Sequence, residues 1–240
     1  MLRRILGYVY FSPFDPLTFI LSFVASSLSP NTIITLDGLA ASGKSSVAQG
    51  IANILQIPFI SSGLLYRLVA LAAQTSKTDQ HSETALLELL GELRFEARVL
   101  GNVVFLNNLD VTAQCHSTLV DALVSVVAQH PQIRAWVNRQ IRQLKPPFLA
   151  EGRDMGTNVF PNADVKIFLT ASSQTRAKRR VAERSKSLAE VQASIEARDT
   201  MDASNSAPAT DAILLDSSDL TLEQTIAQAL ELIQKRLVNP

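Results

Sequence analysis

Short apolar runs alternate with helical patterns along most of the chain. Thr32–Asp37 is a β-branched run that ends at Gly38 and predicts a buried strand, and Ser45–Leu55 follows with apolar residues on one helix face. The same patterns predict further strands at Pro58–Ile60, Phe148–Ala150, Val165–Leu169 and Ala212–Leu215, and a closing helix at Leu222–Leu237. This order predicts an α/β fold, in which helices flank a parallel sheet.

Two segments depart from this alternation. Between about residues 64 and 145, Leu93–Ala97 and Val103–Leu106 flank a predicted turn at Gly101–Asn102, which indicates an antiparallel hairpin. Helical patterns follow at Thr118–Gln129 and Gln132–Leu144. We interpret this block as a subdomain inserted into a domain that spans residues 31–240. A second helical segment, at about residues 172–202, predicts a helical lid.

The first thirty residues have a different composition from the rest. They hold Phe11, Phe14, Phe19 and Phe23 in a chain that is otherwise poor in aromatic residues. The apolar run Leu17–Leu28 is too short to span a bilayer, and prolines interrupt any longer segment. We interpret residues 1–30 as an N-terminal extension that is disordered or amphipathic, or that precedes the true start. Tethering to a membrane through this extension is the alternative.

Composition excludes several classes of protein. Hydrophobic residues make up 47% of the chain, which is enough for a large core. The 22 Lys and Arg residues balance the 22 Asp and Glu residues, so no overall field favours nucleic acid or an anionic membrane. The single cysteine, Cys115, cannot form an intrachain disulfide, and no Cys/His spacing indicates zinc. We therefore expect a cytoplasmic monomer without a stable membrane association, and any anionic ligand must be held by local charge.

A phosphate-binding loop follows the first predicted strand of the domain. Residues 38–45 read GLAASGKS and fit G-x-x-x-x-G-K-[ST] between a predicted strand and a predicted helix. The backbone N–H groups of such a loop surround the phosphates, Lys44 reaches the β and γ oxygens, and Ser45 ligates Mg²⁺. Asp37 or Glu151 would hold the same ion through water. The residues predicted to bind ATP are Gly38, Leu39, Ala40, Ala41, Ser42, Gly43, Lys44, Ser45 and Ser46.

Arginines supply candidates for binding a second polyanion. Arg67 lies one turn into a helix that begins near Ser62, and Arg153 follows the strand at Phe148–Ala150. Ligands of open α/β sheets lie at the carboxyl ends of strands, where both segments fall. A basic cluster in the predicted lid would close over ATP and exclude water. Its members are Arg176, Lys178, Arg179, Arg180, Arg184 and Lys186.

Together these segments resemble bacterial cytidylate kinase. The similarity runs from about Ile33 to the C-terminus, and GLAASGKSS, SSGLLYR, AEGRDMGTNVFPNADVKIFL, RAKRR and ARDTMD carry it. It implies a P-loop parallel sheet with an enlarged monophosphate-binding insert and a mobile lid, and ATP-dependent phosphorylation of CMP or dCMP. It assigns the cytosine ring to Ser62, Arg134 and Asp154, the CMP phosphate to Arg67 and Arg153, and the ribose to Ser125, Arg198 and Asp202. It also places Tyr66 at the acceptor. The residues that the resemblance implies for catalysis are Lys44, Arg153, Asp154, Arg176 and Arg180.

Several positions differ from the family pattern. Ser61 and Asn205 stand where the family usually carries an aspartate and an arginine, and His116 stands where an arginine is common. These differences keep two alternatives open: a kinase for another small acceptor such as UMP, and a non-catalytic nucleotide-binding relative. Individual residues also have structural alternatives. Arg134 could lie on a solvated face, Ser125 could bond to its own helix, and Arg153 could pair with Asp154.

Overall fold

The computed structural model describes residues 4–5, 8–9, 28–99, 101–181, 187–202 and 206–238. At positions 4, 5, 8, 9, 194, 198, 201 and 202 it describes only the backbone. Most of the predicted extension at residues 1–30 therefore lies outside the described residues, as do Arg184, Lys186 and Asn205. Within the extension, β1 (Arg4–Ile5) pairs antiparallel with β2 (Tyr8–Val9).

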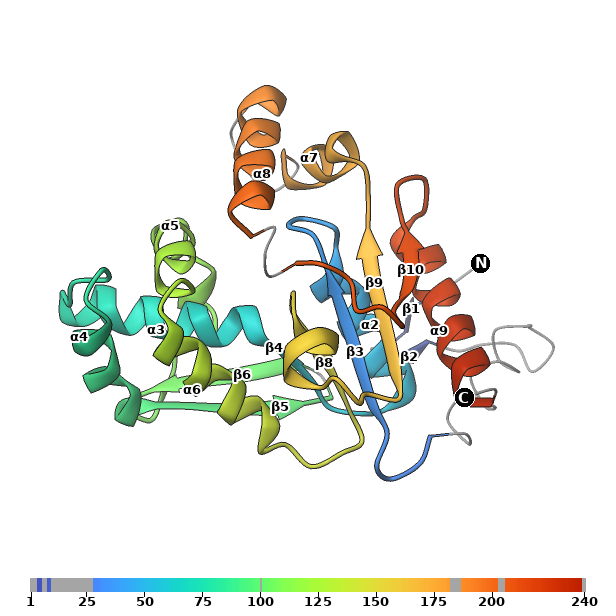
Figure 1. Cartoon of the computed structure of the whole chain (residues 1–240), viewed down its shortest axis with the longest axis horizontal. Coiled ribbons are helices and arrows are strands. Elements are labelled where there is room, and N and C mark those ends of the chain that lie inside the picture. The colour runs from blue at the N-terminus through green and yellow to red at the C-terminus, as the bar shows by residue number, and fades with distance from the viewer. Residues whose placement is uncertain are drawn as a thin grey trace.

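One sheet of eight strands organises the domain, in the order β10-β9-β3-β8-β4-β5-β6-β7. The strands from β10 to β4 run parallel, with β3 between β9 and β8 (Figure 1). Their bounds are β3 Ile33–Gly38, β4 Phe59–Ser61, β8 Phe148–Glu151, β9 Val165–Thr170 and β10 Ile213–Asp216. The predicted α/β fold is confirmed. The first and last residues of each predicted strand lie within two residues of the observed bounds.

The predicted hairpin exists, but it belongs to the main sheet. β5 (Leu93–Arg98) pairs antiparallel with β4 and with β6 (Gly101–Leu106), and β7 (Leu109–Asp110) completes this edge. The turn predicted at Gly101–Asn102 is wrong. Arg98 pairs with Gly101, so the chain reverses between those two residues and Asn102 is a strand residue. The predicted bounds of the insert and the lid stay predictions.

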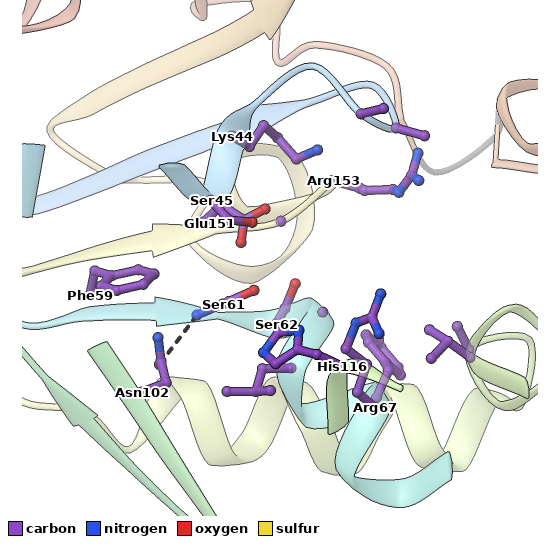
Figure 2. Close-up of a pocket in the computed structure, with 18 of the residues that line it drawn as sticks. Lys44, Ser45, Phe59, Ser61, Ser62, Arg67, Asn102, His116, Glu151 and Arg153 are labelled. Atoms are coloured by element: carbon purple, nitrogen blue, oxygen red, sulfur yellow. Dashed lines mark hydrogen bonds between the residues drawn. The ribbon is translucent and has the colours of Figure 1, made fainter. Parts of the chain in front are cut away.

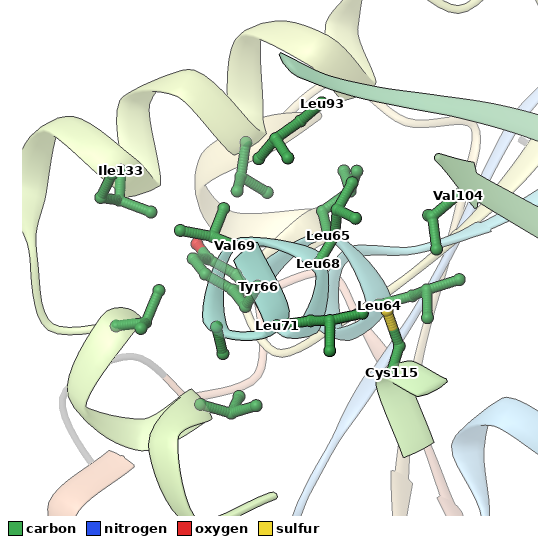
Figure 3. Close-up of a cluster of buried hydrophobic side chains, with 14 of the residues drawn as sticks. Leu64, Leu65, Tyr66, Leu68, Val69, Leu71, Leu93, Val104, Cys115 and Ile133 are labelled. Carbon is green, nitrogen blue, oxygen red and sulfur yellow. The ribbon is translucent and has the colours of Figure 1, made fainter. Parts of the chain in front are cut away.

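Alternating side chains of the parallel strands contribute to two hydrophobic cores. Leu149 packs with α2 (Lys44–Leu55) and α9 (Leu222–Val238), whereas its neighbours Phe148 and Ala150 belong to the core around α3 (Ser62–Ser76). This alternation is the period of a strand that is buried on both faces. Fully buried side chains of α3 such as Leu65 and Leu68 form the centre of the second core (Figure 3).

Helices of the insert cover α3, and those of the lid region lie beyond the phosphate-binding loop. α5 (Thr118–Val127) and α6 (Pro131–Arg142) contact α3, and α4 (Glu83–Glu88) contacts α6. α7 (Ser173–Val181) and α8 (Leu188–Asp202) pack on each other, on the same side of the sheet's edge as the phosphate-binding loop (Figure 1). Shorter helical turns are η1 (Leu89–Glu92), η2 (Gln114–His116) and η3 (Met155–Val159). Within the described residues, no helix has the length and apolar character to cross a bilayer.

Candidate active site

The phosphate-binding loop joins β3 to α2 and has the geometry of an anion cradle. Gly43 adopts a φ of 93° directly before α2, a conformation that glycine reaches without strain. Gly38 lies so close to β9 that an added Cβ would be 2.0 Å from the carbonyl oxygen of Leu169. Lys44 Nζ donates to Leu39 O at 2.8 Å, so the lysine lies along the loop that it would share with a phosphate.

A cleft of about 620 Å³ opens beside this loop. Figure 2 shows Lys44, Ser45 and Glu151 on one side, with Ser62 and Arg67 facing them. The structure brings most of the predicted acceptor residues to this cleft, although they come from separate parts of the chain. Its lining includes Ala40, Ala41, Lys44, Ser45, Ser62, Tyr66, Arg67, Ser125, Arg134, Glu151, Arg153, Asp154 and Arg180.

Arg134 and Asp154 form an ion pair that lines this cleft. α6 starts at Pro131, the first-turn position that proline favours, and Arg134 follows within that turn. Its Nη2 donates to Asp154 Oδ2 at 2.7 Å, so Arg134 is not on a solvated face. The neighbouring Arg153 donates through its Nη1 to Ser206 Oγ at 3.3 Å.

Arg67 lines the cleft and has two described acceptors that do not line it. Its Nη1 donates to Cys115 O at 3.0 Å, and its Nη2 forms an ion pair with Asp121. Burial lowers the pKa of Arg67 from its ordinary value, and nearby Glu151 opposes this shift. Asp121 was not predicted as a site residue, because no motif includes it. Its place on α5 next to Arg67 follows only from the packing of α5 on α3.

Two arginines of α7 contact the phosphate-binding loop. Arg176 is only 5% exposed and lines neither described pocket, because it donates to Ala40 O at 3.1 Å and pairs with Asp199 at 2.6 Å. Its predicted contact with the transferred phosphoryl group stays a prediction. Arg179, a member of the basic cluster, donates to Ser42 O of the same loop at 3.0 Å.

A second pocket, of about 440 Å³, lies on the other side of the loop. Arg179 lines it and also donates to Ser217 O at 2.7 Å. Ser46 lines it as well, as expected for a nucleotide-binding residue, and Ala41 and Arg180 contribute to both pockets. Its polar residues at the start of α9 were missed, because no sequence motif marks them. These are Ser217, Thr221 and Thr225.

The two carboxylates considered for Mg²⁺ have different surroundings. Asp37 accepts hydrogen bonds from the N–H groups of Met155 at 2.9 Å and Gly156 at 2.7 Å, and it does not line the cleft. Burial raises the pKa of Asp37 to about 6. Glu151 lines the cleft with Ser45, and its buried Oε2 has no hydrogen-bond partner among the described residues. A cation at Ser45 would therefore suit Glu151 and not Asp37.

Comparisons with known proteins agree with this geometry. A family model described as cytidylate kinase matches residues 34–235. The chain belongs to the cytidylate kinase family. A cytidylate kinase of Deinococcus deserti is 50% identical over 196 residues, which cover 81% of this chain and 95% of the relative. One from Thermus thermophilus is 47% identical over 85% and 99% of the two chains, and one from Geobacillus thermodenitrificans is 39% identical over 85% and 97%.

Residues that depart from the usual cytidylate kinase pattern lie in the cleft where they are described. Ser61 ends β4, and its N–H donates to Asn102 Oδ1 at 3.4 Å (Figure 2). His116 lines the cleft near Arg67, and its pKa is lowered by burial and by that arginine. Arg198 and Asp202 lie on α8, but their side chains are outside the described residues, so their predicted contacts with the ribose stay predictions.

Proposed function

We propose that the protein transfers the γ-phosphoryl group of ATP to CMP. One observation carries this proposal. The loop residues Lys44 and Ser45 line the same cleft as Arg67 and Arg153, so two phosphorylated ligands can meet there. An ATPase needs only the loop and a water molecule. A cleft with arginines from four separate segments, including Arg180 of the lid, suits an anionic acceptor.

The donor nucleotide would extend from the loop into the second pocket. The N-terminus of α2 faces the phosphates, and the pocket lined by Arg179 and Thr221 would take the nucleoside. Ser45 and Glu151 fit Mg²⁺, because this ion is bound by one or two protein oxygens together with phosphates and water. When bound, the ion would neutralise charge on the phosphate oxygens.

The base of the acceptor would lie against the Arg134–Asp154 pair. Cytosine presents an N4 amino donor beside N3 and O2 acceptors, which match a carboxylate and a guanidinium. Uracil presents a carbonyl oxygen in place of the amino group, and Asp154 would repel it. Ser62 and Tyr66 line the same cleft and complete the base site, while Ser125 with Arg198 and Asp202 would hold the ribose.

Transfer then requires positioning and charge neutralisation rather than a general base. A phosphate monoester dianion is already a nucleophile, so the protein needs to hold it in line with the γ-phosphoryl group. Arg67 and Arg153 would aim the acceptor phosphate. Lys44 and Arg180 would neutralise charge that moves onto the transferred group and the leaving oxygen.

ATP dependence also agrees with the expected cytoplasmic location. The monomeric state stays a prediction.

An acceptor panel tests the proposal. ADP release should depend on CMP or dCMP and be far slower with UMP or AMP, and Lys44→Ala should abolish it. Equal rates with UMP would indicate another acceptor. Tight ATP binding without acceptor-dependent ADP release would indicate the non-catalytic alternative, for which Ser61 and Asn205 are the motivation. Normal turnover in Lys44→Ala would refute the role of the loop.

A further inference from the structure

Asp121 connects two arginines that the proposed reaction uses separately. Its Oδ1 pairs with Arg67 Nη2 of α3, and its Oδ2 lies 4.0 Å from Arg180 Nη2 of α7. The side chain of Asp121 is 12% exposed, and those of the two arginines are 20% and 23% exposed. One carboxylate therefore bridges Arg67 of the acceptor site and Arg180 of the lid, both of which line the cleft.

The two ion pairs differ in strength. Arg67 is in direct contact with Asp121 and also donates to Cys115 O, so its guanidinium is engaged before any ligand binds. The pair with Arg180 is longer than a hydrogen bond and can still shorten. A phosphate dianion carries more charge than a carboxylate and would compete with Asp121 for Arg67. Loss of Arg67 would leave Arg180 as a described cation within reach of Asp121.

Movement of Arg180 toward Asp121 would carry α7 with it. The same helix bears Arg179, which donates to Ser42 O of the phosphate-binding loop, and Arg176, which donates to Ala40 O. A shift of α7 would therefore displace the phosphate-binding loop at the donor site. Since this pair joins α5 to α7, a shorter Asp121–Arg180 distance would draw the two helices together.

We propose that Asp121 is a positioning residue that couples acceptor binding to lid closure by exchanging Arg67 for Arg180. The proposal rests on the proposed function, because the phosphate of CMP must displace Asp121 from Arg67. Linkage then requires that CMP and the donor nucleotide strengthen each other's binding. A purely structural role, such as a charge in the first turn of α5, would change stability and leave this coupling intact.

The test measures the affinity of a non-hydrolysable ATP analogue by calorimetry, with and without CMP. In the parent enzyme CMP should raise this affinity by a factor within the usual range of about 5–150. Asp121→Asn keeps the shape and removes the charge, so the factor should fall close to one. Asp121→Glu keeps a carboxylate that can reach both arginines and should retain a large part of it. Cytidine lacks the phosphate and should give no coupling in any variant.

Glu88→Gln is the matched control, because it removes one negative charge from α4, where Glu88 is exposed. It should keep the parent's coupling, and thermal unfolding of each variant checks the fold. Parent-like coupling in folded Asp121→Asn would overturn the proposal and leave the proposed function standing. Loss of coupling in Asp121→Glu as severe as in Asp121→Asn would also count against the exchange of partners. A parent enzyme that does not bind CMP would overturn both.

Discussion

Replacement of Asp37 by Asn should remove a pH-dependent loss of stability and slow the reaction. Asp37 ends the run that precedes the phosphate-binding loop, and its carboxylate holds the N–H groups of Met155 and Gly156. These residues directly follow Arg153 and Asp154, so Asp37 fixes the acceptor side of the cleft relative to the donor side. Asn offers a single acceptor oxygen, and its amide group would face one of the two N–H groups.

The magnitude follows from the pKa of Asp37. Burial raises this pKa from the ordinary value of 3.8 to about 6. A shift of about two units corresponds to about 3 kcal/mol. Because the folded-state pKa is the higher one, the unfolded chain loses its proton first, and the stability that this group contributes is lost as the pH rises from 3.8 through about 6. The side chain of Asn stays neutral throughout this pH range, as the protonated acid would, so its contribution to stability does not depend on pH.

The unfolding free energy of both proteins should therefore be measured by urea denaturation at two pH values. The difference in unfolding free energy between Asp37→Asn and the parent should change by about 2 kcal/mol in favour of the variant between about pH 4.5 and about pH 7.5. The variant's kcat/KM for CMP should fall by about tenfold to a hundredfold, because a small displacement of the acceptor loop misaligns the phosphates.

Glu231→Gln is the control, since it removes a negative charge at an exposed position of α9. Its stability relative to the parent should not change with pH in this way. A difference between Asp37→Asn and the parent that stays constant from acid to neutral pH would refute the reasoning about burial. Unchanged kcat/KM would show that the two N–H contacts do not position Arg153 and Asp154.

Two further predictions concern the core and the donor pocket. Leu68 is fully buried in the core around α3 (Figure 3), so Leu68→Ala should lower the unfolding free energy by about 2–5 kcal/mol in urea denaturation, and a loss below 1 kcal/mol would contradict its packing role. Arg179→Ala should raise KM for ATP by about tenfold while KM for CMP stays nearly constant, because Arg179 lines only the second pocket. A larger effect on KM for CMP in the acceptor assay would place the donor elsewhere.

Local patterns were sufficient for most of the elements and for the phosphate-binding loop. The period of apolar residues depends on neighbours in the chain, so it located β3, α2 and the later strands to within two residues. The loop motif is contiguous, and the conformation of Gly43 is a local property. The hairpin was also predicted, but its turn was misplaced, because the register of β5 and β6 depends on pairing across the two strands.

The sequence by itself determined the fold class, the phosphate-binding loop and the arginine-rich segments, because those features depend on residues that are close together in the chain. Only the tertiary structure decided which partners these side chains take. It placed Arg134 on Asp154, paired Arg176 with Asp199, and brought Asp121 between Arg67 and Arg180. Such pairs join residues that are far apart in the chain, and their geometry follows from how α3, α5 and α7 pack around the cleft.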